Sequence, residues 1–430
     1  MGKEAVGVGS DQLSTNAKQV IERSIEIEES KDIGEYSFEE YFEIGETAQI
    51  IEKNNHKIVA LQFPDELLWA ANRVQKLISE KCQSDVKICI LADTSFGSCC
   101  VDYVAADHFN ATIIVHYGHA CLSYFTNRIS VFYVFTKKKY EKKIEEFFEE
   151  HFIQFNDNHE NFLIFYDSPY HHELNTMNFL KNKINENFGE NKKIQICEIE
   201  KKYFEEEKKG KKEQTQGNCE EPENCECKNT NSEEKIKILE NKGEKILFGR
   251  KLNHKIQKIH KNFGIIWIGD VESITLRNLK MRFNANKFYV WNPQDSSFIQ
   301  EKVLTRSLMQ RFGLMEKAKE ANLIGIIIGS VAVSNYLEIL EYLKKIIKNA
   351  GKSFYIYVIG KLNPYKLANF PEVDIFVLIS CHENSAIDSR EFYRPVITPF
   401  ELQLALVRFV NLFLFFPFSF LSHIRFTPLE

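Results

Sequence analysis

The chain has 430 residues, enough for two or three domains with cores of their own. Its 55 basic and 60 acidic residues give a formal net charge of −5, which argues against broad binding of nucleic acid or of an acidic membrane surface, since both need a clustered basic excess. Ten cysteines in a chain without secretory features are expected to be reduced, so a recurring group of thiols favours metal binding or redox chemistry over a disulfide framework.

The first 35 residues are polar and irregular, and we expect them to form a flexible leader. They contain no apolar run of the kind found in a secretory signal peptide. Met1 and Gly2 begin a myristoylation pattern, but Val6 stands where that pattern needs serine or threonine. We therefore expect a cytoplasmic chain that is not myristoylated.

Residues 36–158 alternate between strand and helix patterns in the way typical of a parallel α/β domain. Apolar runs rich in β-branched residues predict buried strands at 56–63, 86–93 and 111–118. Between the first two runs, residues 66–81 have the apolar spacing of an amphipathic helix. This alternation indicates a parallel sheet covered by helices on both faces.

The same rhythm recurs twice more, which indicates an internal repeat of architecture. A second α/β domain is predicted over 159–300, with strands at 161–169 and 263–270. A third is predicted over 301–405, with three strands and an amphipathic helix at 335–348. The expected fold class is therefore three related parallel-sheet α/β domains.

Two segments break this pattern. Residues 190–244 are charged and poor in apolar residues, so we expect a disordered insertion within the second domain. Its three cysteines lack a paired C-x-x-C spacing, so we expect no zinc site at Cys219, Cys225 and Cys227. The tail over 406–430 is strongly apolar, but it is short and interrupted by proline, so it predicts no membrane span.

Four cysteines come directly after predicted strands. Cys99 and Cys100 follow one strand, Cys121 follows the next, and Cys381 follows a strand of the third domain. Open α/β sheets gather their ligands beyond the carboxyl ends of the strands, so these thiols are candidates for a common site. Helix N-termini near such loops lower the pKa of a thiol and favour the thiolate that metals bind.

The remaining cysteines do not share this position. Cys82 ends a predicted helix and Cys89 lies inside a strand, so both are expected to pack as small apolar residues. Cys197 lies near the end of a possible strand, and its role stays open.

The spacing of the thiols leaves three interpretations open. Three thiolates at loop tips could hold an iron–sulfur cluster in which one iron lacks a protein thiolate. They could instead bind zinc together with His116 or His119, although a histidine on a strand, such as His116, more often packs or forms hydrogen bonds. The third interpretation is a set of buried thiols in tight loops without a metal.

Several motifs of the chain together resemble the diphthamide synthase family. They occur in the order found in that family, from about Tyr36 to about Leu404 with the insertion excepted. The motifs are LQFPDELL (61–68), DTSFGSCCVDYVAADH (93–108), VHYGHACLS (115–123), KLANFPEVDIFVLISC (366–381) and FYRPVITPFEL (392–402).

The resemblance implies three α/β domains in a pseudo-threefold arrangement around a [4Fe–4S] cluster, which agrees with the repeat described above. It also implies a complex that binds S-adenosylmethionine as its substrate. That complex transfers the 3-amino-3-carboxypropyl group to a histidine of translation elongation factor 2, the first step of diphthamide biosynthesis. The C-x3-C-x2-C loop of common radical enzymes does not occur in this sequence.

Eukaryotic members of the family form a heterodimer of two related subunits. Subunit 1 has one cysteine per domain and holds the catalytic cluster, whereas the other subunit lacks the thiol of the middle domain. No cysteine follows the strand at 263–270, so this chain resembles the second type. The resemblance then implies a subunit that is not catalytic alone and that supports reduction of the cluster in subunit 1. Its implied partners are subunit 1, an electron-donor protein and elongation factor 2, and include neither nucleic acid nor a membrane.

Carried over residue by residue, the resemblance implies Cys100, Cys121 and Cys381 as the ligands of the cluster. We favour Cys100 over its neighbour Cys99 because Cys100 stands at the opening of a helix that Asp102 can cap. A fourth ligand is then expected for the remaining iron.

Two other functions remain alternatives. One is a cluster-free scaffold that stabilises subunit 1. The other is a stand-alone iron–sulfur lyase or dehydratase resembling quinolinate synthase, which the missing cysteine of the middle domain disfavours. The chain also departs from the family after residues 398–406, where a Phe-rich tail replaces a longer C-terminal segment.

Overall fold

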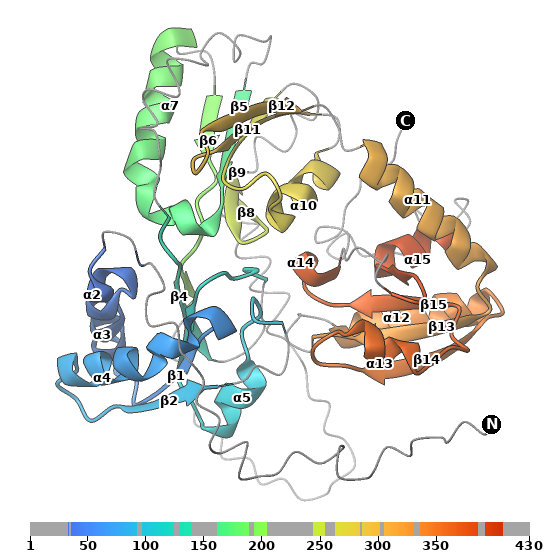
Figure 1. Cartoon of the computed structure of the whole chain (residues 1–430), viewed down its shortest axis with the longest axis horizontal. Coiled ribbons are helices and arrows are strands. Elements are labelled where there is room, and N and C mark those ends of the chain that lie inside the picture. The colour runs from blue at the N-terminus through green and yellow to red at the C-terminus, as the bar shows by residue number, and fades with distance from the viewer. Residues whose placement is uncertain are drawn as a thin grey trace, which may run out of the picture.

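The computed structural model places three mainly parallel sheets in three lobes that meet at the centre of the molecule (Figure 1). This arrangement confirms the predicted fold class of three related α/β units. The predicted tail, nearly all of the leader and most of the insertion, with its three cysteines, lie outside the described residues. The structure describes residues 33, 36–92, 97–123, 129–138, 161–188, 193–203, 244–253, 263–283, 286–301, 305–330, 336–385 and 392–406.

The first sheet has a buried interior of apolar strands and a partly exposed edge strand, β2 (Lys87–Leu91). Its central strand β1 (Ile58–Gln62) pairs in parallel with β2 and β3 (Ile113–Tyr117), and β4 (Ser130–Val134) pairs with β3. The short strand β7 (Lys202–Tyr203) comes much later in the chain and pairs antiparallel with β4 at the edge of the sheet. The accompanying helices are α2 (Phe38–Tyr41), α3 (Ile44–Lys53), η2 (Asp65–Ala70), α4 (Ala71–Lys81) and α5 (Tyr103–His108).

The helix predicted over 66–81 is present, and its first part is a 3₁₀ helix. Leu67 in η2 and Ala71, Val74 and Ile78 in α4 are buried against the sheet. Their spacing of three and four residues places them on one face, as the sequence predicts.

The second sheet has β5 (Asn161–Tyr166) between β6 (Lys193–Ile196) and β10 (Phe263–Ile268), all parallel. On the other side of β10, β11 (Lys287–Asn292) pairs in parallel and β12 (Ser297–Glu301) closes the edge antiparallel. A separate hairpin and three helices complete this unit. These elements are β8 (Glu244–Leu247), β9 (Arg250–Asn253), η4 (Ser168–Glu173), α7 (Leu174–Phe188) and α10 (Ile274–Arg282).

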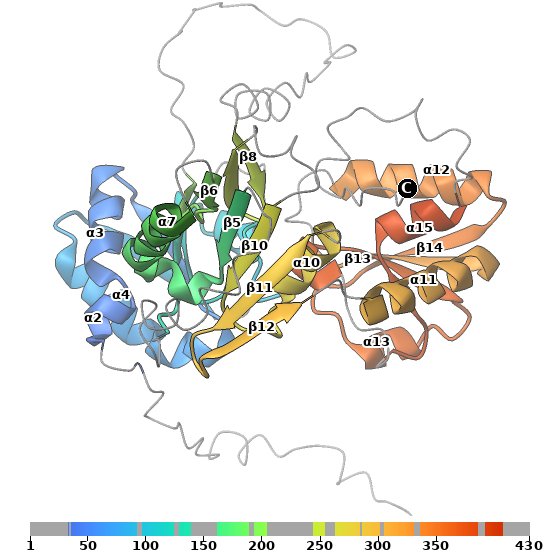
Figure 2. The same cartoon turned by 90° about the horizontal axis from the view of Figure 1, so that it is seen from above.

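The third sheet is wholly parallel. Its strands β13 (Leu323–Ile328) and β15 (Ile375–Ile379) are central, with β14 (Ser353–Val358) and β16 (Val396–Ile397) at the edges. Helix α12 (Tyr336–Asn349) covers one face of the sheet and α13 (Pro364–Ala368) the other (Figure 2). None of the described helices is both long and apolar enough to span a bilayer. The helices of this unit are α11 (Thr305–Glu320), α12 (Tyr336–Asn349), α13 (Pro364–Ala368), α14 (His382–Ser385) and α15 (Pro399–Leu406).

The three sheets share one topology. In each unit the first parallel strand in the chain lies between the second and the third, and the fourth lies beside the third. The third strands are therefore equivalent, and they are β3, β10 and β15. Cys121 and Cys381 follow two of these strands, whereas Gly269 and Asp270 follow the third. The repeat explains why cysteines far apart in the sequence reach one place.

Candidate metal centre

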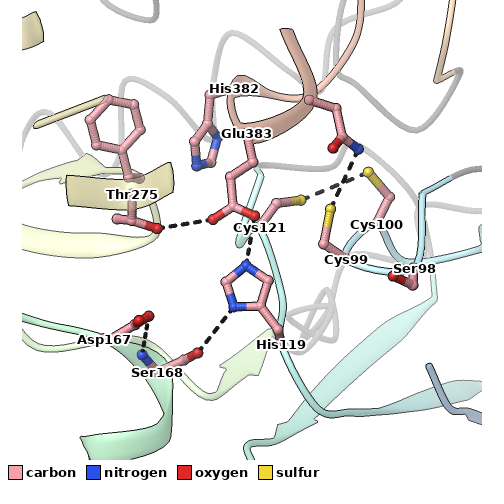
Figure 3. A network of polar contacts seen from close by, with 12 residues as sticks. Ser98, Cys99, Cys100, His119, Cys121, Asp167, Ser168, Thr275, His382 and Glu383 are labelled. Carbon is pink, nitrogen blue, oxygen red and sulfur yellow. Dashed lines mark hydrogen bonds and ion pairs between the residues drawn. The ribbon is translucent and has the colours of Figure 1, made fainter. Parts of the chain in front are cut away.

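Four thiols converge where the three units meet. The Sγ atoms of Cys99, Cys100, Cys121 and Cys381 all lie within 4.8 Å of one another. Three of these residues are at most 2% exposed, and Cys99 is 9% exposed. The Sγ atoms of Cys100 and Cys121 are 3.9 Å apart (Figure 3). Among the described residues, this is the one group of metal-ligating side chains.

The sequence placed these thiols at a common site, and the structure brings them together. The three implied ligands Cys100, Cys121 and Cys381 belong to the group, and so does Cys99, the alternative to Cys100. Cys82 and Cys89 are partly buried elsewhere, and Cys197 is fully buried in the core of the second unit. Proximity therefore does not choose between Cys99 and Cys100, and the choice of three ligands stays a prediction.

Hydrogen bonds to three of its own consecutive backbone carbonyls hold the loop that carries the adjacent cysteines. The oxygen of Ser98 accepts from His116 Nε2 at 3.1 Å, and that of Cys99 accepts from the backbone N–H of Cys121 at 3.0 Å. The oxygen of Cys100 accepts from Gln62 Nε2 at 2.8 Å. Strand ends β1 and β3 therefore fix the path of this loop, which directs two successive thiols into the same group.

Gln62 and His116 are both buried inside the first unit. The Oε1 atom of Gln62 also accepts from the backbone N–H of Asp102 at 2.9 Å, so one amide holds both sides of the turn. Burial lowers the pKa of His116 to about 4, which leaves the ring neutral with a proton on Nε2 for Ser98. The side chain of Asp102 accepts from the N–H of Ala105 and caps α5, as predicted.

Replacing Gln62 by leucine is expected to lower the free energy of unfolding by about 1–3 kcal/mol, because the carbonyl of Cys100 and the N–H of Asp102 lose their buried partner. Urea denaturation of the metal-free chain measures this loss. Gln83→Leu is the matched control, because position 83 is exposed. Equal losses in the two variants would contradict a role for Gln62 in holding the loop.

The pKa values of three of these thiols shift in different directions. Hydrogen bonds from Cys100, Cys121 and Cys99 hold the pKa of Cys381 well below its usual value. Hydrogen bonds with Cys100, the largest cause, and with Cys381, together with burial, raise the pKa of Cys99 and of Cys121. A thiolate at Cys381 is therefore stabilised by the neighbouring S–H donors.

A polar network beside the thiols connects all three units (Figure 3). Glu383 accepts a hydrogen bond from Thr275 Oγ1 at 3.0 Å and lies 2.7 Å from His119 Nε2. The other ring nitrogen of His119 lies 3.4 Å from Ser168 Oγ. Partial desolvation lowers the pKa of His119, but Glu383 more than offsets this and the net shift is upward. Burial raises the pKa of Glu383, the hydrogen bond from His119 lowers it, and the net shift is downward. Both directions are those of an ion pair.

The donor set suits a thiophilic metal. Thiolates are the ligands of iron–sulfur clusters and of structural zinc. Neither imidazole considered as a zinc ligand belongs to the group, because His116 bonds to Ser98 and His119 to Glu383. His116 thus has the hydrogen-bonding role expected of a histidine on a strand.

Comparison with known proteins identifies the family. The sequence pattern of diphthamide synthesis proteins matches residues 63–411. The chain belongs to the diphthamide synthesis protein family. Three relatives are named 2-(3-amino-3-carboxypropyl)histidine synthase subunit 2. The protein of Xenopus laevis is 36% identical over 402 residues, and the match covers 91% of this chain and 73% of the Xenopus chain. That of Danio rerio is 36% identical over 400 residues (92% and 73%), and that of Schizosaccharomyces pombe 35% over 398 residues (92% and 69%).

Solved structures of the family share the fold. A crystal structure of Dph2 from Pyrococcus horikoshii with a 4Fe-4S cluster matches with a TM-score of 0.60 at 16% identity, covering 84% of this chain and 90% of that one. A second structure of the same protein matches with a TM-score of 0.58. The predicted membership of the family is thus confirmed, and the relatives carry the name of the second subunit type.

Sequence reasoning missed the polar residues that hold the site. Gln62, Thr275 and Glu383 have partners 38 or more positions away, so no local pattern shows which groups they bind. Asn384 was also missed, and its Nδ2 donates to Cys99 Sγ at 3.5 Å. A signal for three of them was their place just past or at the end of a strand, beside a thiol-bearing loop.

Proposed function

We propose that this chain is the iron–sulfur subunit of a complex that transfers the 3-amino-3-carboxypropyl group from S-adenosylmethionine to a histidine of translation elongation factor 2. This transfer is the first step of diphthamide biosynthesis. The buried group of four thiols in a member of the diphthamide synthesis family carries the proposal. The name that the relatives share, a synthase subunit 2, supports a place in a complex with a subunit 1.

Cys100, Cys121 and Cys381 would hold a [4Fe–4S] cluster, with Cys99 as the nearest further thiol. Such a cluster, when bound, supplies one-electron redox chemistry. The protein contributes burial, which excludes water, and a polar contact beside the ligands, the hydrogen bond from Asn384 to the neighbouring thiol of Cys99. Both tune the potential of an iron–sulfur centre.

The role proposed for this subunit is electron support and not the transfer step. Its second unit has Gly269 and Asp270 where the other two units have cysteine, which matches the subunit type that lacks a middle-domain thiol. An electron-donor protein in the cytoplasm would reduce this subunit, which would keep the cluster of subunit 1 reduced. Ser98, exposed beside the buried Cys99, places the thiol group close to the surface on that side.

The test is a complex with an unaltered subunit 1 and either the unaltered chain or its Cys381→Ala variant. Transfer to elongation factor 2 is measured with limiting protein reductant and again with excess dithionite. We expect the variant to slow the first reaction strongly and the second far less, because dithionite reduces subunit 1 directly. Iron and sulfide are counted anaerobically in this chain paired with a subunit 1 that lacks cluster ligands.

The alternative of a cluster-free scaffold makes the opposite prediction. Iron absent from the unaltered chain, together with full transfer under limiting protein reductant, would overturn the proposal in favour of the scaffold. Transfer of the group by this chain without subunit 1 would overturn it in favour of a stand-alone enzyme.

A further inference from the structure

The hairpin β8–β9 of the second unit ends in a two-residue turn, Phe248–Gly249. Both turn residues have left-handed backbone angles, with φ of 48° and 71°, which is the conformation of a type I′ turn. Leu247 and Arg250 form the last pair of the ladder on either side of the turn. No local pattern indicates this hairpin, because its short strands follow the charged insertion.

The turn contacts two residues that each follow a candidate ligand in the chain. The ring of Phe248 lies 4.8 Å from the ring of His382, which follows Cys381. At Gly249, a Cβ atom would lie 2.2 Å from the Cβ of Leu122, which follows Cys121. The backbone of the turn therefore packs directly against the loop of the first unit, while its aromatic side chain packs against the loop of the third.

Hydrogen bonds from Arg250 and Lys251 hold the turn against its own unit. The guanidinium of Arg250, 3% exposed, donates from Nη1 to the carbonyl of Phe248 at 2.8 Å and from Nη2 to that of Tyr166 at 2.9 Å. The N–H of Lys251 donates to the carbonyl of Glu198 at 2.9 Å. Asp167, beside Tyr166, interacts electrostatically with Arg250 and favours its charged form. The turn is thus fixed to the central strand β5 of its own unit.

We propose that the Phe248–Gly249 turn is what the second unit contributes to the metal centre in place of a thiol. It acts as a positioning element that fixes the loops of Cys121 and Cys381 relative to each other and covers their second-unit side. Gly249 permits the close approach to Leu122, and Phe248 fixes His382. This inference rests on the proposed function for the identity of the metal, but the positions of the thiols can be tested without any metal.

The decisive variant is Gly249→Ala, whose added methyl collides with Leu122. In the metal-free chain we expect Cys121 and Cys381 to react several-fold faster with iodoacetamide, as measured site by site by mass spectrometry. In the loaded chain we expect a shifted midpoint potential and faster loss of iron to a chelator. Adding Leu122→Gly, which removes the opposing Cβ at a residue with φ of 54°, should restore slow alkylation.

Gly351→Ala is the matched control. Gly351 has a nearly identical φ of 69°, but no atom lies within 4 Å of its added Cβ, so it reports the backbone strain alone. Phe248→Leu tests the other half of the turn and is used where Gly249→Ala does not fold. Alkylation rates in the Gly249 or Phe248 variant no higher than in Gly351→Ala would overturn the positioning role. Failure of the unaltered chain to bind iron would overturn the proposed function instead, so the two failures are distinguishable.

Discussion

Replacing Cys100, Cys121 or Cys381 by serine, one at a time, is expected to remove the iron of this chain and the EPR signal that appears after dithionite reduction. Each of these thiols is buried within the four-thiol group, in which Cys99 is the one further thiol among the described residues. Serine is a harder and much less acidic ligand than cysteine, so it binds iron–sulfur clusters poorly. Iron and sulfide counting after anaerobic purification measures the result, again with a subunit 1 that lacks cluster ligands.

Cys82→Ser and Cys89→Ser are the controls for this series. Both residues are partly exposed cysteines outside the group, so their replacement should leave iron content and spectrum unchanged. Iron that survives the loss of Cys121 or Cys381 would show that the thiol group does not hold the metal.

Cys99→Ser decides the choice that proximity leaves open. If Cys100 is the ligand, the Cys99 variant keeps its iron, and its EPR spectrum changes slightly because the hydrogen bond from Asn384 is altered. Iron lost with Cys99 and kept without Cys100 would reverse the assignment. Loss of iron in both variants would make Cys99 the fourth ligand.

The positions of the strands and their burial in parallel sheets were predictable, because a parallel sheet needs apolar residues on both faces of each strand. Such runs, as in β1, β3 and β15, are visible without knowledge of their partners. The position of the cysteines at the carboxyl ends of these strands then predicted a common site. What the pattern left open was the assignment within that site, since Cys99 and Cys100 are adjacent in the loop and both point into the group.

The elements that sequence reasoning missed are short or polar. β7 has two residues, and the β8–β9 hairpin has polar residues in both strands, so neither shows a hydrophobic period. The role proposed for the Phe248–Gly249 turn depends on its contacts with loops more than 100 positions away in the sequence. Long-range packing of this kind leaves no local trace in one sequence.

Replacing Glu383 by alanine is expected to weaken both the fold and the metal centre. Glu383 is 5% exposed and connects Thr275 of the second unit with His119 of the first. Its loss leaves the buried hydroxyl of Thr275 without this acceptor, at a cost of about 1–3 kcal/mol in the free energy of unfolding. The larger penalty for breaking a fully buried ion pair does not apply, because the side chain of His119 is 49% exposed and can be hydrated.

The effect on the metal should exceed the effect on the fold. Glu383 and His119 are each two positions from a candidate ligand, so their contact fixes the Cys381 loop against the Cys121 loop. Residues that orient metal ligands typically contribute 10- to 100-fold in affinity, so we expect roughly that loss in iron retention against a chelator. Urea denaturation and chelator competition measure the two effects separately.

Two further variants separate orientation from general stability. Glu338→Ala removes an exposed glutamate of α12 and should change neither measurement. Glu383→Gln keeps an acceptor for Thr275 but loses the charge that faces His119, so it should recover most of the stability and less of the iron retention. If Glu383→Gln restores both equally, the carboxylate charge has no separate role. If Glu383→Ala leaves iron retention unchanged, the three units are held at the thiols by packing alone, with the Phe248–Gly249 turn as the main contact between the two loops.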